Sequence, residues 1–345
     1  MVSFSFNQRV KLFEHDILQN LILLSSLFVI TFAFAPIRPI PEELTGQDLV
    51  DHINSAASTF QTENYAVTHE KMHTRSMHEK FNAPFPDEFR ATEREFVLDA
   101  TPLNFDARTR WPQCKSMKLI REQSNCGSCW AFSTAEVISD RTCIASNGTQ
   151  QPIISPTDLL TCCGMSCGEG CDGGFPYRAF QWWARRGVVT GGDYLGTGCK
   201  PYPIRPCNSD NCVNLQTPPC RLSCQPGYRT TYTNDKNYGS NSAYPVPRTV
   251  AAIQADIYYN GPVVAAFIVY EDFEKYKSGI YRHIAGRSKG GHAVKLIGWG
   301  TERGTPYWLA VNSWGSQWGE SGTFRILRGV DECGIESRIV AGLPR

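Results

Sequence analysis

The residues best suited to covalent chemistry lie around Cys129, in the run Gln123-Ser124-Asn125-Cys126-Gly127-Ser128-Cys129-Trp130. Apolar residues at near-helical spacing from Ser128 to Arg141 predict a helix with Cys129 in its first turn. Free backbone N–H groups and the helix dipole favour a thiolate there, and a thiolate is a nucleophile for acyl transfer. The alternative is that Cys129 is one more disulfide partner, because the chain holds 14 cysteines and all of them could pair.

A general base for such a nucleophile has few candidates. Five of the seven histidines precede residue 100, so only His283 and His292 lie in the cysteine-rich part. His292 stands between Gly290-Gly291 and the apolar run Ala293–Trp299, which predicts a position at the mouth of a strand. His283 lies in a run that is typical of a solvated loop. We therefore expect His292 to be the base.

Composition limits the class of protein. The 345 residues exceed the roughly 100–200 of one compact domain. A net charge of +1 gives no reason to expect nucleic acid as a partner. The 14 cysteines, all between Cys114 and Cys333, indicate either disulfides or metal sites. Cys126 and Cys129 have the C-x₂-C spacing of zinc ligands, but no matching histidine set accompanies them, so we expect no metal and no cofactor.

The N-terminal residues indicate whether the cysteines form disulfides or bind metal ions. Leu21 to Ala35 is an uncharged, mostly apolar run of 15 residues that follows Arg9 and Lys11. This length suits the core of a signal peptide and is short for a membrane span of about 20 residues, although a signal anchor is the alternative. We expect residues 1–35 to be a signal peptide, the product to be secreted or lysosomal without stable membrane association, and disulfides to form.

Residues 36–100 contain no cysteine and few long apolar runs. Leu49 to Ile53 can form one short helix. The segment is therefore predicted to be a pro-segment or linker rather than a self-sufficient domain, followed by a larger domain over residues 101–345.

The secondary-structure pattern changes along this larger domain. Further helices are expected to begin at Ser155-Pro156 and to span Phe175–Arg186 and Thr249–Tyr259. Strands are expected at Val263–Tyr270, Ala293–Trp299, Tyr307–Asn312 and Thr323–Leu327. Helices followed by strands predict an α+β arrangement of two lobes, and a cleft between lobes is a usual place for an active site.

The run Cys126–Trp130 matches C-G-[SA]-C-[WY] and resembles the papain-like cysteine proteases, in particular the cathepsin B-like subgroup. The resemblance covers residues 103–345. It implies a papain-like two-lobed fold, with a helical N-terminal lobe and a β-barrel-like C-terminal lobe, and a cysteine endopeptidase made as a zymogen. Residues 36–100 would be its inhibitory pro-segment. Other matching motifs are Phe105–Arg108, Cys162–Gly164, Cys171–Gly174, Gly290–Ala293, Asn312–Gly315 and Cys333–Ser337.

Two further residues complete the expected chemistry. Asn312, at the end of a predicted strand, can accept a hydrogen bond from His292. Because its amide is neutral, it does not remove the imidazolium charge that stabilises a thiolate. Gln123 would donate its side-chain amide to the oxyanion, together with the Cys129 backbone N–H. An inactive protease-like binding protein is the alternative, and the intact set of these residues argues against it. The resemblance implies as substrate-binding residues Gly173, Gly174, Phe175, Ala293, Trp314 and Arg338.

The resemblance also implies the disulfide pairs and leaves Cys333 unpaired. Asn147, in the only Asn-x-Ser/Thr sequon, is a candidate glycosylation site. Expected partners are protein and peptide substrates, the chain's own pro-segment and cystatin-like inhibitors. The implied pairs are Cys114–Cys143, Cys126–Cys171, Cys162–Cys220, Cys163–Cys167, Cys199–Cys224 and Cys207–Cys212.

Two departures from cathepsin B concern specificity. Its occluding loop carries a His-His pair that holds a substrate's C-terminal carboxylate, whereas the matching loop here, Cys207 to Cys212, is short and contains Asp210 but no histidine. We therefore expect weak or no dipeptidyl carboxypeptidase activity. Arg338 replaces the acidic residue that accepts arginine two positions before the scissile bond, so we expect poor cleavage of Arg-Arg substrates.

Overall fold

The computed structural model describes residues 44–56, 59–65, 76–90, 92, 101–206, 215–240 and 243–345. All of them belong to one compact unit, Pro41–Arg345. The expected signal peptide, residues 1–35, and the loop from Cys207 to Cys212 lie outside the described residues. In the part of the chain that is described, no helix has both the length and the apolar character needed to cross a membrane.

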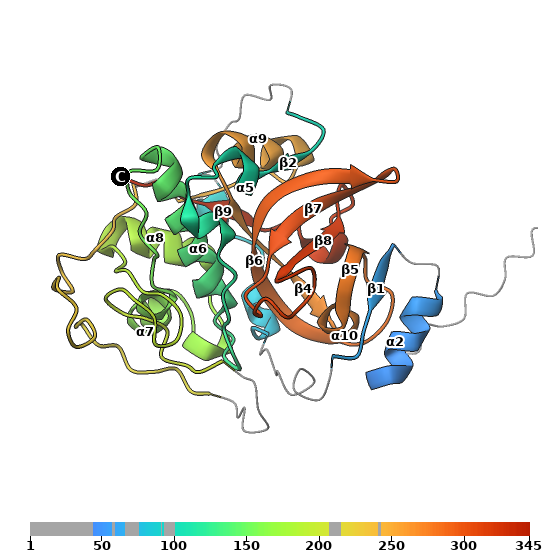
Figure 1. Cartoon of the computed structure of the whole chain (residues 1–345), viewed down its shortest axis with the longest axis horizontal. Helices are drawn as coiled ribbons and strands as arrows, with labels where there is room; N and C mark the ends of the chain where they lie inside the picture. Colours follow the sequence, from blue (N-terminus) through green and yellow to red (C-terminus); the bar gives the residue numbers. More distant parts are fainter. Residues whose placement is uncertain are drawn as a thin grey trace, which may run out of the picture. The chain divides into compact units, whose positions relative to one another are not determined.

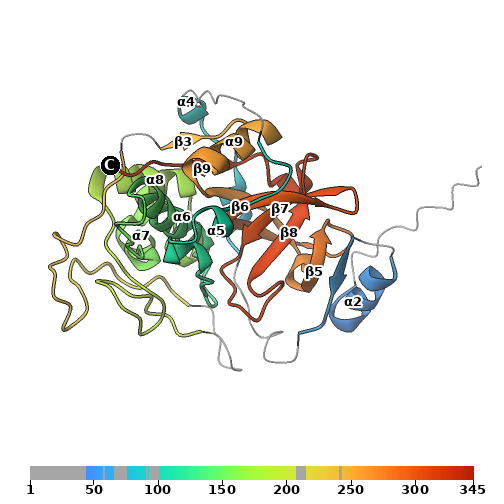
Figure 2. The ribbon, with the colours of Figure 1, turned by 45° about the horizontal axis from the view of Figure 1, so that its top comes forward.

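One half of the unit is helical and is built around α6, Cys129–Ala145, which is buried over almost its whole length. α7, Pro156–Cys162, and α8, Pro176–Arg186, pack against α6 on the same side of the sheet (Figures 1 and 2). The expected caps are present: the Ser155 side chain accepts from the Asp158 N–H, and Gly187, with a φ of 69°, ends α8. We call residues 107–240 the helical half.

The other half is a sheet whose nine described strands lie in the order β1-β5-β8-β7-β6-β4-β9-β3, with β2 paired to β6. All pairs are antiparallel except β5 with β8. We call residues 244–341 the sheet half; α9, Val250–Asn260, packs against β6. The strands are β1 Phe60–Thr62, β2 Phe105–Asp106, β3 Tyr244–Pro245, β4 Val263–Tyr270, β5 Tyr276–Tyr281, β6 Ser288–Glu302, β7 Thr305–Val311, β8 Thr323–Leu327 and β9 Ile339–Ala341.

Short helical turns connect these elements. They lie mostly beside the site or between the two halves, and α10 follows β4 directly. Their bounds are α4 Asp87–Arg90, α5 Ala107–Arg110, α10 Glu271–Glu274, η1 Glu79–Asn82, η2 Lys115–Lys118, η3 Gly164–Ser166, η4 Gly170–Asp172 and η5 Glu332–Gly334.

The described residues between 44 and 90 bury apolar side chains against both halves. α2, Gly46–Ser55, contributes Leu49 and Ile53 to the core of the sheet half, and β1 pairs with β5 beside it (Figure 1). Met77, Phe81 and Phe89 join the core of the helical half, which also contains Cys129. This segment has no separate hydrophobic core among its described residues, because its buried side chains belong to the cores of the two halves.

Candidate active site

Cys129 is the first residue of α6, as the sequence predicts. Its side chain is fully buried, and its Sγ accepts a hydrogen bond from the Ala293 backbone N–H at 3.4 Å. Ala293 lies on β6 directly after His292, and α6 packs against β6. The contact between helix and strand therefore brings the nucleophile candidate beside the base candidate.

His292 is held by the residues that follow β7. Its Nε2 lies 2.7 Å from Asn312 Oδ1, which also accepts the Ser313 backbone N–H at 2.8 Å. Because this amide oxygen can only accept, Nε2 carries the hydrogen and Nδ1 is the basic nitrogen. The ring of Trp314 lies 4.8 Å from the imidazole, between centroids, and covers it. The arrangement fixes the imidazole in one tautomer.

Burial opposes both charges of the expected thiolate–imidazolium pair in this covered form of the protein. Burial raises the pKa of Cys129 to about 12, although nearby backbone N–H groups oppose the shift. Burial also lowers the pKa of His292 to about 4, against the hydrogen bond to Asn312. His292 Nδ1 is buried without a hydrogen-bond partner. A neutral thiol and a neutral imidazole result, because a low-dielectric environment disfavours both charges.

Residues 76–82 bind directly beside His292. The Met77 N–H donates to the Gly291 carbonyl at 2.8 Å, and the Gly291 N–H donates back at 2.9 Å. The His78 N–H donates to the Asp172 carbonyl at 3.0 Å. Gly291 belongs to the sheet half and Asp172 to the helical half, so this segment binds across both halves.

Glycines on both sides allow the segment to approach closely. A Cβ on Gly173 would lie 2.4 Å from the Phe81 ring, and a Cβ on Gly290 would lie 2.4 Å from the Met77 carbonyl oxygen. Any other residue at these positions would displace the segment. A cavity of about 490 Å³ remains beside it, lined by residues of the segment, of the helical half and of the sheet half: Ser76, Met77, His78, Glu79, Lys80, Glu169, Asp172, Ser288, Lys289 and Gly290.

Gln123 is buried close to the site, but its amide makes contacts that the sequence did not predict. Its Nε2 donates to the Cys126 carbonyl at 2.8 Å, and its Oε1 accepts from Ser313 Oγ at 2.7 Å. In this form the amide therefore links the chain before Cys129 to the chain after Asn312. The prediction that it donates to an oxyanion concerns a state with substrate bound.

Tyr202 supports the same segment and was missed by sequence reasoning. Its hydroxyl donates to the Gln123 carbonyl at 2.8 Å and lies 2.9 Å from Ser128 Oγ. Burial raises its pKa, so it remains a neutral donor. No local pattern marks Tyr202 in the sequence, because its role depends on a contact made across 79 residues.

The expected substrate-binding residues lie on both sides of Cys129. A Cβ on Gly174 would lie 2.6 Å from the Trp130 ring, and Phe175 packs perpendicular to Phe81 at 5.0 Å between centroids. Ala293 pairs with Ala266 of β4, whose N–H donates to the Arg338 carbonyl at 3.2 Å.

The Arg338 side chain is half-buried rather than directed fully into solvent. Its Nε is buried without a hydrogen-bond partner. Burial lowers the pKa of Arg338, the charge of Asp331 opposes this shift, and Arg248 adds to it. Arg338 therefore has an unpaired Nε–H, with one carboxylate, Asp331, and one guanidinium, Arg248, acting on its charge.

The prediction that His283 lies in a solvated loop is wrong. Its ring stacks on Tyr270 with 3.7 Å between centroids, and its Nδ1 lies 3.1 Å from Asp272 Oδ2. Asp272 is fully buried and also accepts from Tyr281 Oη at 2.7 Å. His283 is thus part of the packing around α10, which leaves His292 as the histidine at the site.

Five disulfides are formed among the described residues, and Cys129 and Cys333 are the free cysteines there. The sixth pair that the resemblance implies, Cys207–Cys212, lies outside the described residues. Asn147 is exposed in the turn after α6. The disulfides are Cys114–Cys143, Cys126–Cys171, Cys162–Cys220, Cys163–Cys167 and Cys199–Cys224.

Comparison with known proteins agrees with the fold and identifies the family. Residues 101–343 match the family described as "Papain family cysteine protease". The chain belongs to the papain family of cysteine proteases. It is similar to the "Gut-specific cysteine proteinase" of Caenorhabditis elegans, at 61% identity over 93% of this chain and 98% of that protein. It is also similar to "Cathepsin B-like cysteine proteinase 5" of the same organism, at 50% identity over 93% and 97%.

Among the solved structures that this chain resembles are precursor forms of cysteine proteases. Procathepsin B S9 from Trypanosoma congolense is 36% identical, with a TM-score of 0.70, over 88% of this chain and 99% of that chain. Digestive procathepsin L 3 of Tenebrio molitor, at 20% identity and a TM-score of 0.61, shares the fold. The resemblance to cathepsin B-like proteases and the α+β fold class are confirmed. The protein is a cysteine protease made as a zymogen, and the inactive alternative is not favoured.

Proposed function

We propose that Cys129 is the nucleophile and His292 the general base of this protease. The contact of 3.4 Å between Cys129 Sγ and the Ala293 N–H carries the proposal, because it brings an unpaired sulfur beside the residue that follows His292. The unpartnered Nδ1 of His292 then takes the thiol proton once the site opens. Asn312 orients the imidazole through the bond of 2.7 Å to Nε2.

The reaction proceeds through an acyl-enzyme. The sulfur attacks the peptide carbonyl, His292 protonates the leaving amine, and water hydrolyses the thioester. The Cys129 backbone N–H and the Gln123 amide donate to the oxyanion, which requires one Gln123 N–H to be directed at substrate. Loss of one such donor typically lowers the rate about 10²–10³-fold.

Residues 36–100 act as the inhibitory pro-segment in this proposal, and residues 1–35 as a signal peptide. The burial of Cys129 and the hydrogen bonds from residues 76–78 to both halves support inhibition by occlusion. Neutralisation of both catalytic groups adds a second barrier, because neither the thiol nor the imidazole carries the charge that the reaction needs.

Active-site labelling tests the assignment of the nucleophile. After removal of the pro-segment, an epoxysuccinyl inhibitor should label the protein stoichiometrically, and Cys129→Ala should abolish the label together with peptide hydrolysis. Cys333→Ala is the matched control, since it removes the other free cysteine of the described residues and should retain both. Labelling that persists in Cys129→Ala, measured by intact mass, would refute the assignment.

We further propose an endopeptidase with little dipeptidyl carboxypeptidase activity. The four residues between Cys207 and Cys212 include no histidine to bind a C-terminal carboxylate, and Asp210 repels one. Release of C-terminal dipeptides from a free-acid peptide should be slow relative to internal cleavage of the same peptide blocked as its amide. Efficient release from the free acid would contradict this.

Arg338 is proposed to set specificity two residues before the scissile bond. Its unpartnered Nε and its charge favour an acidic or apolar side chain there and disfavour arginine. The ratio of kcat/KM for Phe-Arg over Arg-Arg substrates should fall by roughly tenfold or more in Arg338→Glu, because a like-charge contact becomes an opposite-charge one. An unchanged ratio would place Arg338 outside the subsite.

The remaining assignments follow from the class. We propose secretion or lysosomal delivery, protein and peptide substrates, cystatin-like inhibitors as partners, and a glycan on the exposed Asn147. The run from Tyr307 to Glu320 is similar to that of gut proteases of parasitic worms, and one relative is named gut-specific. Digestion of dietary protein is the role that this similarity supports.

A further inference from the structure

Two disulfides hold residues 199–206 and 215–224, the described parts of what we call the cysteine loop. Cys199–Cys224 closes the loop on itself, and Cys162–Cys220 ties it to the last residue of α7. Their surroundings differ. Cys199 is fully buried and Cys224 is half-buried, whereas Cys220 is exposed and Cys162 is half-buried. A thiol in solution therefore reaches Cys220 more readily than either sulfur of Cys199–Cys224.

Lys200 lies against one sulfur of the exposed disulfide. Its Nζ is 3.1 Å from Cys162 Sγ, and the Thr161 hydroxyl is 3.5 Å from the same sulfur. The Lys200 side chain is only 8% exposed, so water screens its charge little. A thiolate formed at Cys162 would be stabilised directly by this ammonium group and by the hydroxyl.

Lys200, Lys236 and Asp158 together carry a net positive charge, because two ammonium groups share one carboxylate. Asp158 Oδ1 lies 3.0 Å from Lys200 Nζ, and Asp158 Oδ2 lies 2.8 Å from Lys236 Nζ. Burial alone would raise the pKa of Asp158, but the two lysines outweigh it and hold that pKa below its usual value. Burial lowers the pKa of Lys200, and Asp158 opposes this shift. Tyr232, which donates to Asp158 at 2.7 Å, has a raised pKa and remains neutral.

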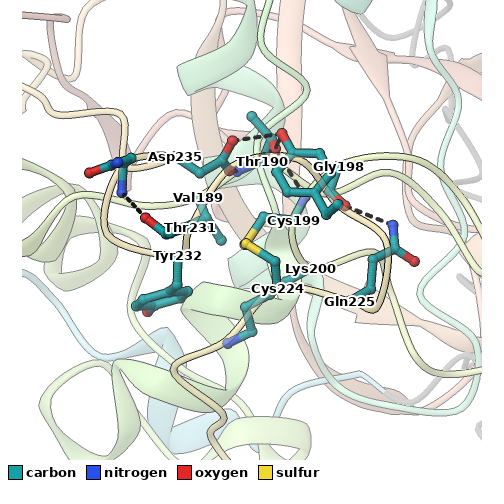
Figure 3. The surroundings of a disulfide bond; sticks show 12 residues. Val189, Thr190, Gly198, Cys199, Lys200, Cys224, Gln225, Thr231, Tyr232 and Asp235 are labelled. Atoms are coloured by element: carbon teal, nitrogen blue, oxygen red, sulfur yellow. Dashed lines mark hydrogen bonds between the residues drawn. A yellow bond between two sulfur atoms is a disulfide. The ribbon is translucent and has the colours of Figure 1, made fainter.

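The second disulfide of the loop lacks these features. Figure 3 shows Cys199–Cys224 with Thr190, Lys200, Gln225, Tyr232 and Asp235 around it. The Gln225 N–H donates to the Cys199 carbonyl at 2.7 Å, and the Cys199 N–H donates to Thr190 Oγ1 at 3.1 Å. Both bonds hold the Cys199 backbone. Among the described residues, the Lys200 ammonium group contacts the Cys162 sulfur and not a sulfur of this second disulfide. Cys199–Cys224 therefore serves as an internal reference.

We propose that Cys162–Cys220 is a thiol-exchange site, with Cys220 as the attacked sulfur and Cys162 as the leaving group. A small thiol such as glutathione attacks Cys220 Sγ as its thiolate, and the disulfide bond breaks. The electron pair leaves with Cys162 beside Lys200. A second thiol then attacks the mixed disulfide and releases Cys220. Two small thiols become one disulfide, and their two protons end on Cys162 and Cys220.

Opening of Cys162–Cys220 would release residues 215–219, which contact Asn125 and Cys171 beside the active site. The Thr217 hydroxyl, three residues before Cys220, accepts from the Cys171 N–H at 2.9 Å. The Leu215 N–H reaches the Asn125 carbonyl at 3.4 Å, four residues before Cys129. Cys220 anchors this stretch to α7, so opening the bond leaves residues 215–219 attached to the site wall only by such contacts.

Mapping of the adduct in the full-length protein tests the proposal. After brief treatment with reduced glutathione and alkylation, peptide mass mapping should find glutathione on Cys220 and the alkyl group on Cys162. Opening of Cys162–Cys220 should be at least roughly tenfold faster than opening of Cys199–Cys224, because access and leaving-group stabilisation both favour it. Adducts found first on Cys162, or equal opening rates, would overturn the proposal.

A pair of lysine variants separates the charge effect from general loosening. Lys200→Met should slow opening of Cys162–Cys220 by roughly tenfold. Lys236→Met removes the other lysine of Asp158 and leaves Lys200 in contact with Cys162, so it should slow opening by clearly less than Lys200→Met does. Equal rates in Lys200→Met and the wild type would refute the role of the ammonium group. If Lys200→Met does not fold, Lys200→Arg, which keeps the charge, should retain fast exchange, and the adduct position in the wild type decides the outcome.

Discussion

The helical half and the sheet half differ in what holds them together. All five disulfides of the described residues lie between Cys114 and Cys224, and the sheet half contains one cysteine, the unpaired Cys333. The sheet half instead has a continuous ladder of strands and a cluster of aromatic side chains in its core. That cluster includes Phe267, Phe273, Tyr276, Tyr281, Trp314, Trp318 and Phe324.

The difference follows from how much regular structure each half contains. Between α8 and β3 the described residues form no helix or strand, so few backbone ladders stabilise that stretch. Cross-links compensate by reducing the conformational freedom of the unfolded chain. The comparison teaches that a reductant should loosen the half that carries Cys129 and leave intact the half that carries His292.

The largest expected effect belongs to the aromatic core. Phe273 is fully buried, and its ring centroid lies 4.9 Å from that of Phe324 and 5.1 Å from that of Trp318. Phe273→Ala should lower the free energy of unfolding by about 3–5 kcal/mol, equally with and without reductant. Urea unfolding measures this, with the half-exposed Tyr259→Ala as control. If the loss in the free energy of unfolding changed with reductant, the sheet half would also depend on disulfides, which would contradict the proposed difference between the halves.

A disulfide of the helical half should contribute nearly as much. Cys126–Cys171 closes a loop with a sequence separation of 45 residues, and its double replacement by alanine should cost about 4 kcal/mol by the chain-entropy argument. The control is Cys333→Ala in the sheet half, with an expected change below about 1 kcal/mol. Thermal or urea unfolding of the oxidised proteins provides the comparison. Equal losses in both proteins would show that the cross-link is not what stabilises the helical half.

A smaller effect concerns the pH dependence of pro-segment binding. Cys129→Ala leaves His292 as the one catalytic group that can titrate. The His292 imidazole has a pKa of about 4 while residues 76–82 cover it, and its pKa returns to the usual value of about 6.5 when it is exposed. The open state therefore binds more protons, so opening is favoured as the pH falls from about 6.5 to about 4. Hydrogen-exchange protection of the Met77 and Gly291 amides, corrected for intrinsic rates, should fall across this range.

The matched control is the double variant Cys129→Ala, His292→Gln, which should lose most of that dependence. In the protein with Cys129 present, release of the pro-segment moves a proton from the Cys129 sulfur to the His292 imidazole. The net uptake of protons is then smaller than in Cys129→Ala, and so is the pH dependence of the release. An unchanged profile in the double variant would assign the dependence to groups other than His292.

Local pattern predicted the elements that carry the site. The bounds of β4 and β8 are confirmed, because long apolar runs between turn residues mark them. α6, α7, α8 and α9 begin within one residue of prediction, and in α7 and α9 the side chains of Ser155 and Thr249 cap the first turn. β5 and β9 were missed: the run Tyr276–Tyr281 contains Lys277, Ser278 and Gly279, and β9 has only three residues.

Features set by distant contacts were not predictable in this way. The charge state of Cys129 depends on its burial and on the segment laid across the site, not on the helix start alone. His283 looked solvated because its local run is polar, whereas Asp272 and Tyr270, on the preceding elements, hold its ring. Short-range pattern identifies which residues can react, and tertiary burial decides whether they do.

Removal of the pro-segment has a consequence for the sheet itself. β1 covers one side of β5, with Phe60 opposite Gly279, and once β1 is gone β5 becomes an edge strand open to pairing with another molecule. Lys277 and Lys275 now bind Glu63 and Asn64 at 2.7 and 2.9 Å. Activation releases both lysines along the new edge, where their charges discourage self-association of the mature enzyme.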